Sequence, residues 1–114
     1  MKNLKPSATL LQEQYRRLRR QLGQIGYLTQ GSVFERTPSQ QGSRFVWTRK
    51  LKAQTVTVAL SKQQYRWLRQ AALNQRKLVR TVTQMQILSR RILFQTIPGV
   101  TRRKPLNPKV LRLI

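Results

Sequence analysis

The sequence predicts an α+β fold in which an N-terminal helix and a long C-terminal helix cover a small three-stranded antiparallel sheet. Three observations predict it. Apolar residues recur at helical spacing over residues 8–25 and, without a helix breaker, over residues 61–97. Between these stretches, residues 55–60 (TVTVAL) alternate between two faces as a strand does. A sheet of three strands cannot bury its apolar face alone, so the helices are expected to cover it.

The first helix is expected over about residues 8–25. Ser7 or Thr9 can cap its first turn, and Gly26 is suited to end it. Its apolar residues are spaced alternately by four and three positions, as in a two-helix packing seam. These residues are Leu11, Tyr15, Leu18, Leu22 and Ile25. We therefore expect this helix to pack antiparallel against part of the long helix.

The sheet is expected over about residues 31–60. Residues 44–51 (RFVWTRKL) and 55–60 are rich in β-branched and aromatic residues, and the short connection between them predicts a hairpin. Residues 31–37 (GSVFERT) are expected to add a weaker third strand. The connection, residues 52–54, has neither glycine nor Asn-Gly, so the sequence leaves the type of turn open.

Alternation along residues 44–51 places Phe45 and Trp47 on one face and Val46 on the other. Both faces cannot be buried in a sheet that is covered on one side. Because aromatic side chains gain most from burial, we expect Phe45 and Trp47 to belong to the core. On the neighbouring strand, one face is expected to carry Val56, Val58 and Leu60.

The long helix is expected over about residues 61–97, from a capping box formed by Ser61 and Gln64 to a stop at Pro98-Gly99. One broad stripe of this helix is apolar. The stripe comprises Tyr65, Leu68, Ala72, Val79, Val82, Met85, Ile92 and Leu93. The opposite side is basic, with Arg66, Arg69, Arg76, Lys77, Arg80 and Arg91. Residues 1–97 are thus expected to form a single α-βββ-α domain, followed by an extended basic tail over residues 98–114.

Charge is the most unusual property of the chain. It has 24 Lys and Arg residues and two acidic residues, which gives a formal net charge of +22. Internal ion pairs can neutralise few of these cations, so a polyanion is the expected counter-charge. A charge this one-sided favours nucleic acid, acidic protein or an anionic membrane as the partner. The absence of a long apolar segment argues against membrane spanning, and the cytoplasm, with the nucleoid if the protein is bacterial, is the expected location.

Catalysis is not expected. The chain has no histidine and no cysteine, and Glu13 and Glu35 are its whole supply of carboxylate side chains. General acid–base chemistry and metal sites depend mainly on these residue types. Tyr15, Tyr27 and Tyr65 occur where ordinary packing explains them, with no base marked beside them. We therefore predict a protein without catalytic residues, metal or cofactor.

Three groups of cations are candidates for nucleic-acid binding. The first lies on the hairpin, since a two-stranded ribbon fits the major groove of DNA: Arg44, Arg49, Lys50 and Lys52. The second covers the two helices: Arg16, Arg17, Arg19 and Arg20, with Arg66, Arg69, Arg76, Lys77 and Arg80. The third lies in the tail: Arg102, Arg103, Lys104 and Lys109. Surface helices usually alternate such cations with glutamates, whereas on these two helices Glu13 is the single acidic residue, so a purely solvated role explains most of these cations poorly.

At the runs GSVFERT, RFVWTRKLK, TVTVALS, QQYRWLRQA and NQRKL, the chain resembles a family of short, largely uncharacterised bacterial proteins that are associated with mobile elements and sometimes described as transposase-associated. The resemblance covers roughly residues 10–97. It is carried by Gly31, Ser32, Arg36, Trp47, Thr48, Arg49, Lys50, Thr55, Val56, Ser61, Tyr65 and Asn74. Many members carry several cysteines in the loop that corresponds to residues 37–43, whereas this chain has none there, so the resemblance implies no metal site.

These observations together predict a non-enzymatic nucleic-acid-binding protein. The resemblance implies an accessory of a mobile element, which favours DNA over RNA and makes a transposase a candidate protein partner. RNA binding is the alternative within the same class, since arginine-rich helices and Trp67 would also serve a folded RNA. An adaptor whose long helix dimerises or docks on a transposase is the alternative from a different class. A membrane-surface role is not expected, because glutamines dilute the amphipathic faces.

Overall fold

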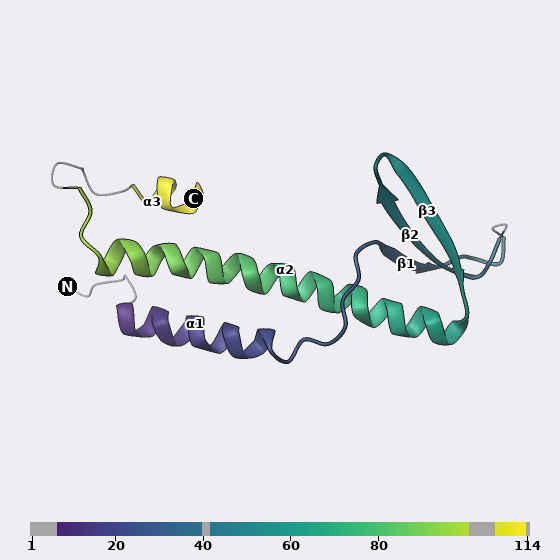
Figure 1. Ribbon diagram of the computed structural model, residues 1–114, viewed down its shortest axis with the longest axis horizontal. Coiled ribbons are helices and arrows are strands. Elements are labelled where there is room, and N and C mark those ends of the chain that lie inside the picture. The colour runs from purple at the N-terminus through teal and green to yellow at the C-terminus, as the bar shows by residue number, and fades with distance from the viewer. Residues whose placement is uncertain (1–6, 40–41, 101–106, 114) are drawn as a thin grey trace. The chain divides into compact units, whose positions relative to one another are not determined.

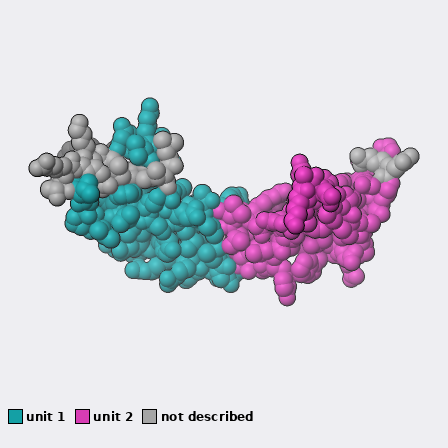
Figure 2. All heavy atoms as spheres, turned by 45° about the horizontal axis from the view of Figure 1, so that its top comes forward, with its two compact units in different colours: residues 1–24, 80–114 teal, residues 25–79 magenta. Residues whose placement is uncertain are grey.

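The structure is a computed structural model that describes residues 7–39, 42–100 and 107–113. Its elements, in chain order, are α1 (Ala8–Leu22), β1 (Ser32–Glu35), β2 (Phe45–Leu51), β3 (Gln54–Leu60), α2 (Lys62–Thr96) and α3 (Pro108–Leu113) (Figure 1). This order confirms the predicted α+β fold. The chain divides into two compact units, one of residues 1–24 with 80–114 and the other of residues 25–79 (Figure 2). Helix α2 contributes to both, and each unit is described by itself.

In the first unit, α1 begins as predicted at an N-cap serine. The Ser7 hydroxyl accepts a hydrogen bond from the backbone N–H of Leu10 at 3.2 Å. The helix ends at Leu22, before the predicted end at residue 25. Its last turn is tightened by a hydrogen bond of 3.1 Å from the N–H of Gln24 to the carbonyl of Gln21. Gly23 follows the last helical residue, where the entropy cost of fixing a glycine favours an end to the helix.

The predicted seam of α1 faces the C-terminal half of α2, and the two helices run antiparallel (Figure 1). Leu11 is only 1% exposed, and Tyr15, Leu18 and Leu22 are half-buried. On α2, Thr81 and Leu88 are buried in the same unit. They are seven residues apart, as the positions of a two-helix seam are.

Two residues of the apolar stripe predicted for α2 are exposed instead. Val79 is 54% exposed and Leu93 is 42% exposed. The helix is buried by different neighbours along its length, since its N-terminal half belongs to the unit of the sheet and its C-terminal half to the unit of α1. The apolar stripe predicted for the whole of α2 was therefore too wide. Within each unit, only part of the stripe is buried.

In the second unit, the three strands form an antiparallel sheet in the order β1-β2-β3. Strands β2 and β3 pair from Phe45 with Leu60 to Leu51 with Gln54, which leaves a two-residue loop. Both loop residues have positive φ, 46° at Lys52 and 65° at Ala53. Positive φ at both central positions is the signature of a type I′ turn, whose twist matches that of the paired strands. The turn type that the sequence left open is thereby defined.

The base of the sheet is buried on both faces. Phe45 is 8% exposed and Val46 is 1% exposed, although the two side chains point to opposite faces. The ring of Phe45 lies against that of Tyr65 on α2, with centroids 4.6 Å apart. In the sheet register, Val46 lies between Phe34 of β1 and Ala59 of β3. The expectation that only one face could be buried was wrong at this end of the sheet.

Toward the turn, the predicted apolar face of the sheet is open to solvent. Val56 and Val58 of β3 are 37% and 40% exposed. Trp47, which pairs with Val58 in the register, is half-buried. Its indole N–H donates a hydrogen bond of 3.0 Å to the backbone carbonyl of Gln30, which fixes the ring. The burial predicted for Phe45 is confirmed, and that for Trp47 is partial.

The predicted capping box of α2 is present with both of its hydrogen bonds. The N–H of Gln64 donates to the Ser61 hydroxyl at 3.1 Å, and the N–H of Ser61 donates to the Gln64 side-chain oxygen at 2.9 Å. At the other end, α2 stops at Thr96, two residues before Pro98. Proline has no N–H to continue the helix and restricts the residue before it.

The expected extended tail contains a short helix, α3, over Pro108–Leu113. Its start has a local cause, because the Asn107 side-chain oxygen accepts a hydrogen bond of 2.8 Å from the N–H of Lys109. Asparagine before a proline in the first helical turn is a common helix start, and the prediction missed it. The tail cations Arg102, Arg103 and Lys104 lie outside the described residues.

Candidate nucleic-acid interface

The basic residues of α1 all lie on its exposed side. Arg16, Arg17, Arg19 and Arg20 are exposed, whereas Leu11 on the other side is buried. At 100° per residue, the four arginines span an arc of about 160°. The opposite side packs against α2, so burial of the apolar seam turns the arginines toward solvent together. This helix therefore presents a basic face within its unit, on which Glu13 is the one acidic residue.

The predicted basic residues of α2 are exposed as well. Arg66, Arg69, Arg76 and Lys77, in the unit of the sheet, fall within an arc of about 100° on the helix. Arg80 belongs to the other unit and is also exposed. In neither unit does α2 supply an acidic residue that could pair with these cations, since its sequence has none. Phosphate oxygens would suit the planar guanidinium groups on this face.

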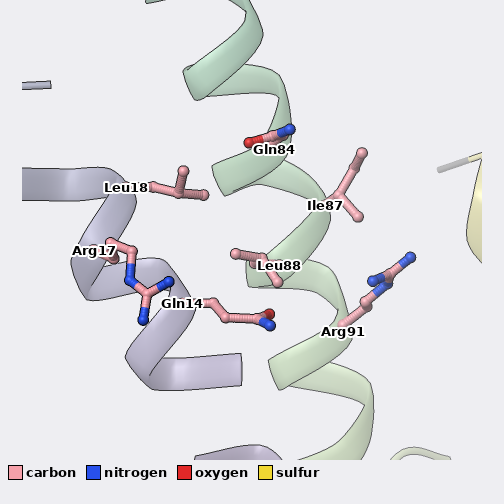
Figure 3. A pocket seen from close by; sticks show the side chains of 7 residues that line it. All are labelled: Gln14, Arg17, Leu18, Gln84, Ile87, Leu88 and Arg91. Atoms are coloured by element: carbon pink, nitrogen blue, oxygen red, sulfur yellow. The ribbon is translucent and has the colours of Figure 1, made fainter. Parts of the chain in front are cut away.

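A groove of about 370 Å³ lies between α1 and α2 in the first unit (Figure 3). It is lined by Gln14, Arg17 and Leu18 of α1 and by Gln84, Ile87, Leu88 and Arg91 of α2. The leucines of the two helices point toward one another, and Arg17 and Arg91 lie on either side of Leu88 in this view (Figure 3). The groove thus combines an apolar floor with two cations and two amide groups.

The hairpin cations differ from one another in their surroundings. Arg44 pairs with Glu35, with its Nη2 2.7 Å from the carboxylate Oε2, and its guanidinium also lies 5.1 Å from the centre of the Phe45 ring. Arg44 is nevertheless 69% exposed, so it can still reach solvent. Glu35, one of the two acidic residues of the chain, thus pairs with a hairpin cation.

Arg49 is held by the segment that precedes the sheet. Its guanidinium donates a hydrogen bond to the Gln30 side-chain oxygen, while the Gln30 carbonyl accepts from Trp47. Gly31 makes this close approach possible, because a Cβ there would lie 2.5 Å from the carbonyl oxygen of Thr48. Arg49 is consequently half-buried. Its side chain has a structural role that alternation alone did not reveal.

Lys50 and Lys52 are the freely exposed cations of the hairpin. Lys50 alternates with Arg49 and so lies on the opposite face of the sheet. Lys52 occupies the first position of the turn. Both ammonium groups are available to a ligand that approaches the tip of the hairpin. The structure therefore divides the predicted hairpin set into two fixed arginines and two free lysines.

Sequence reasoning missed several residues that the structure brings to these surfaces. Arg91 was assigned to the basic side of α2 but not to the binding set, and it borders the groove. Its position one helical turn beyond Leu88, a seam residue, could have indicated this. Arg90 is half-buried, and its Nε has no hydrogen-bond partner among the described residues. Gln30 could not be found from local pattern, because its contacts with the sheet are long-range.

Comparison with known proteins gives no match: no family model, no curated protein and no solved structure resembles the chain significantly. Within the ranges that the structure describes, no helix is both long and apolar enough to span a membrane. In the same ranges, His, Cys, Asp and Glu side chains form no group of three that could hold a metal ion. The distribution of charge is thus the feature from which a function can be argued.

Proposed function

We propose that the protein is a non-enzymatic nucleic-acid-binding protein that holds the phosphate backbone of DNA with the arginines of α1 and α2. One observation carries the proposal: the nine helix cations predicted for this role are all exposed. They are Arg16, Arg17, Arg19, Arg20, Arg66, Arg69, Arg76, Lys77 and Arg80. The chain has two acidic side chains against 24 cations, so most of this charge has no carboxylate to meet it within the protein.

Phosphate is the ligand whose chemistry fits these surfaces best. A guanidinium group can donate two parallel hydrogen bonds to a phosphate, and all but one of the nine cations are arginines. Closely spaced cations on one helix face repel one another, and the negative phosphates of a polyanion relieve that repulsion. Their neutralisation also releases the counterions of the polyanion into solution. The affinity is therefore expected to fall steeply with salt.

The hairpin favours DNA as the duplex ligand. Its tip carries exposed Lys50 and Lys52, and a two-stranded antiparallel ribbon has a width that fits the major groove of B-form DNA. The major groove of an A-form RNA duplex is too narrow and deep for such an element. A role as an accessory in transposition is the more specific part of the proposal, and it rests only on the motifs that residues 10–97 share with proteins associated with mobile elements.

Competition between polyanions tests the proposal. The experiment measures the anisotropy of a labelled 20-base-pair DNA duplex bound to the protein, with unlabelled DNA duplex, RNA duplex and an anionic polysaccharide as competitors. We expect the DNA duplex to compete best at equal phosphate or sulfate concentration. Stronger competition by structured RNA would instead assign the protein to RNA. Equal competition by all three would reduce the proposal to non-selective charge attraction.

A further inference from the structure

Two aromatic side chains lie in contact with one another on the surface of the second unit, and packing of the fold does not explain why they are exposed. Tyr27 precedes the sheet and Trp67 lies on α2, and their ring centroids are 5.0 Å apart with an angle of 36° between the planes. Tyr27 is 73% exposed and Trp67 is 52% exposed. Tryptophan is rarely this accessible, because burial of its large apolar surface is favourable.

The pair is held in place by hydrogen bonds of the polypeptide around it. The Asn74 side-chain amide donates to the carbonyl of Tyr27 at 2.9 Å, and the Asn74 side-chain oxygen accepts from Gln70 at 3.0 Å. The N–H of Thr29 donates to the carbonyl of Ala71 at 3.4 Å. The segment that carries Tyr27 is thus attached to α2 at Tyr27 itself and two residues further along, at Thr29. The rings are presented to solvent by a fixed backbone.

From this arrangement we infer that Tyr27 and Trp67 form a stacking site for the bases of single-stranded nucleic acid. The inference rests on the proposed function and specifies the part of the ligand that the arginines do not recognise. Every base has a flat aromatic face, so an exposed ring binds it without sequence selectivity. Arg66 is exposed next to Trp67, about 100° round the helix from it, so its long side chain can reach the phosphates that join the stacked bases.

Charge favours this ligand over a second copy of the chain. An exposed aromatic pair can also mark a contact between proteins. Two copies that approach one another would each bring a net charge of +22, and the repulsion opposes a contact at a site next to arginines. A nucleic-acid strand brings the opposite charge together with the flat apolar groups that the rings can cover. A duplex keeps its bases stacked inside, so its binding should depend little on the pair.

The test compares a labelled oligothymidine of 20 nucleotides with a labelled 20-base-pair duplex in anisotropy titrations at low salt. Trp67→Ala in the full chain should weaken binding of the single strand about tenfold and binding of the duplex less than twofold. Trp67→Phe retains a ring and should restore most of the affinity for the single strand. Val79→Ala is the matched control, because Val79 is an exposed apolar residue of the same helix, and it should change neither affinity.

The outcomes distinguish this inference from the proposed function. If Trp67→Ala weakens both ligands equally, or neither, while the unmodified protein binds them, the stacking site is overturned and the proposed function stands. If the unmodified protein binds neither ligand, the proposed function fails. Light scattering on the same variants adds a further outcome: a dimer that Trp67→Ala dissociates, with unchanged oligonucleotide binding, would assign the aromatic pair to self-association and overturn the inference.

Discussion

The guanidinium group of Arg44, the residue before β2, lies 2.7 Å from the carboxylate of Glu35, the last residue of β1. Both side chains are more than one-third exposed, at 69% and 42%. Water screens such a pair, so it adds little to the stability of the fold. The main consequence of the ion pair is electrostatic: the Glu35 carboxylate neutralises the charge of Arg44, one of the four hairpin cations predicted to bind nucleic acid.

Removing this carboxylate should strengthen binding. Glu35→Gln leaves Arg44 free to contact a phosphate, so the slope of log K against log salt for a DNA duplex should become steeper by about 0.9. The melting temperature should change little, because an exposed ion pair contributes at most about 1 kcal/mol. Arg44→Gln provides the control, because Glu35→Gln should not change the slope in a protein that already lacks the Arg44 guanidinium. Weaker binding by Glu35→Gln would contradict the assignment of Arg44 to the interface.

Arg17 and Arg91, the two arginines beside the α1–α2 groove, should each contact a phosphate of bound DNA. The double variant Arg17→Gln, Arg91→Gln should reduce the magnitude of the salt slope by about 1.8, since each phosphate contact contributes about 0.9. Arg112→Gln removes one charge from α3 at a position outside the predicted binding sets and is the control for net charge. If Arg112→Gln changes the salt slope as much as Arg17→Gln alone, the groove has no special part in binding and only the net charge matters.

Arg49 and Lys50 are neighbours in sequence but should respond differently to replacement by alanine. Arg49→Ala removes the hydrogen bond to Gln30 and should lower the free energy of unfolding by about 1 kcal/mol. Lys50→Ala should leave stability unchanged within about 0.5 kcal/mol and weaken DNA binding. Chemical denaturation and anisotropy titration of both variants measure these effects. Equal loss of stability in both would mean that the contact with Gln30 contributes nothing.

The type I′ turn of the hairpin should be improved by glycine. Ala53 has a φ of 65°, a conformation that costs an L-residue roughly 1–2 kcal/mol and costs glycine little. Ala53→Gly should therefore raise the free energy of unfolding by about 1 kcal/mol, or the melting temperature by about 4–8 °C. Ala59→Gly, in the middle of β3, is the control and should lower both. A lower melting temperature for Ala53→Gly would contradict the positive φ.

Local chemistry explains which elements of the fold were predictable. The capping box of Ser61 and Gln64 and the seam residues Leu11 and Leu18 are specified within one or two helical turns, so the sequence shows them directly. The boundary at Leu22 and the short helix α3 depend on small differences between helix and coil, which single glycine and asparagine residues decide. The positive φ values at the turn follow from strand pairing, which acts over a longer range than turn propensity.

The sequence predicts which cations of the candidate nucleic-acid interface are exposed, but it does not predict the hydrogen bonds that hold the surrounding residues in place. Exposure of the helix arginines follows from helical period alone, because the apolar seam faces inward and the cations occupy the other side. The roles of Gln30 and Asn74 depend on a segment that returns to the sheet and to α2 from far along the chain. No local pattern marks such contacts. For the same reason, the contact between Tyr27 and Trp67, forty residues apart, is not visible in the sequence.

The most direct test of the central claim is the salt dependence of binding to duplex DNA. Anisotropy titrations of the unmodified protein between about 50 and 300 mM salt give the slope of log K against log salt. If the exposed arginines of α1 and α2 hold phosphates, the magnitude of the slope should be at least about 4, which corresponds to four or more phosphates neutralised. A slope near zero, or no binding at the lowest salt concentration, would contradict the account.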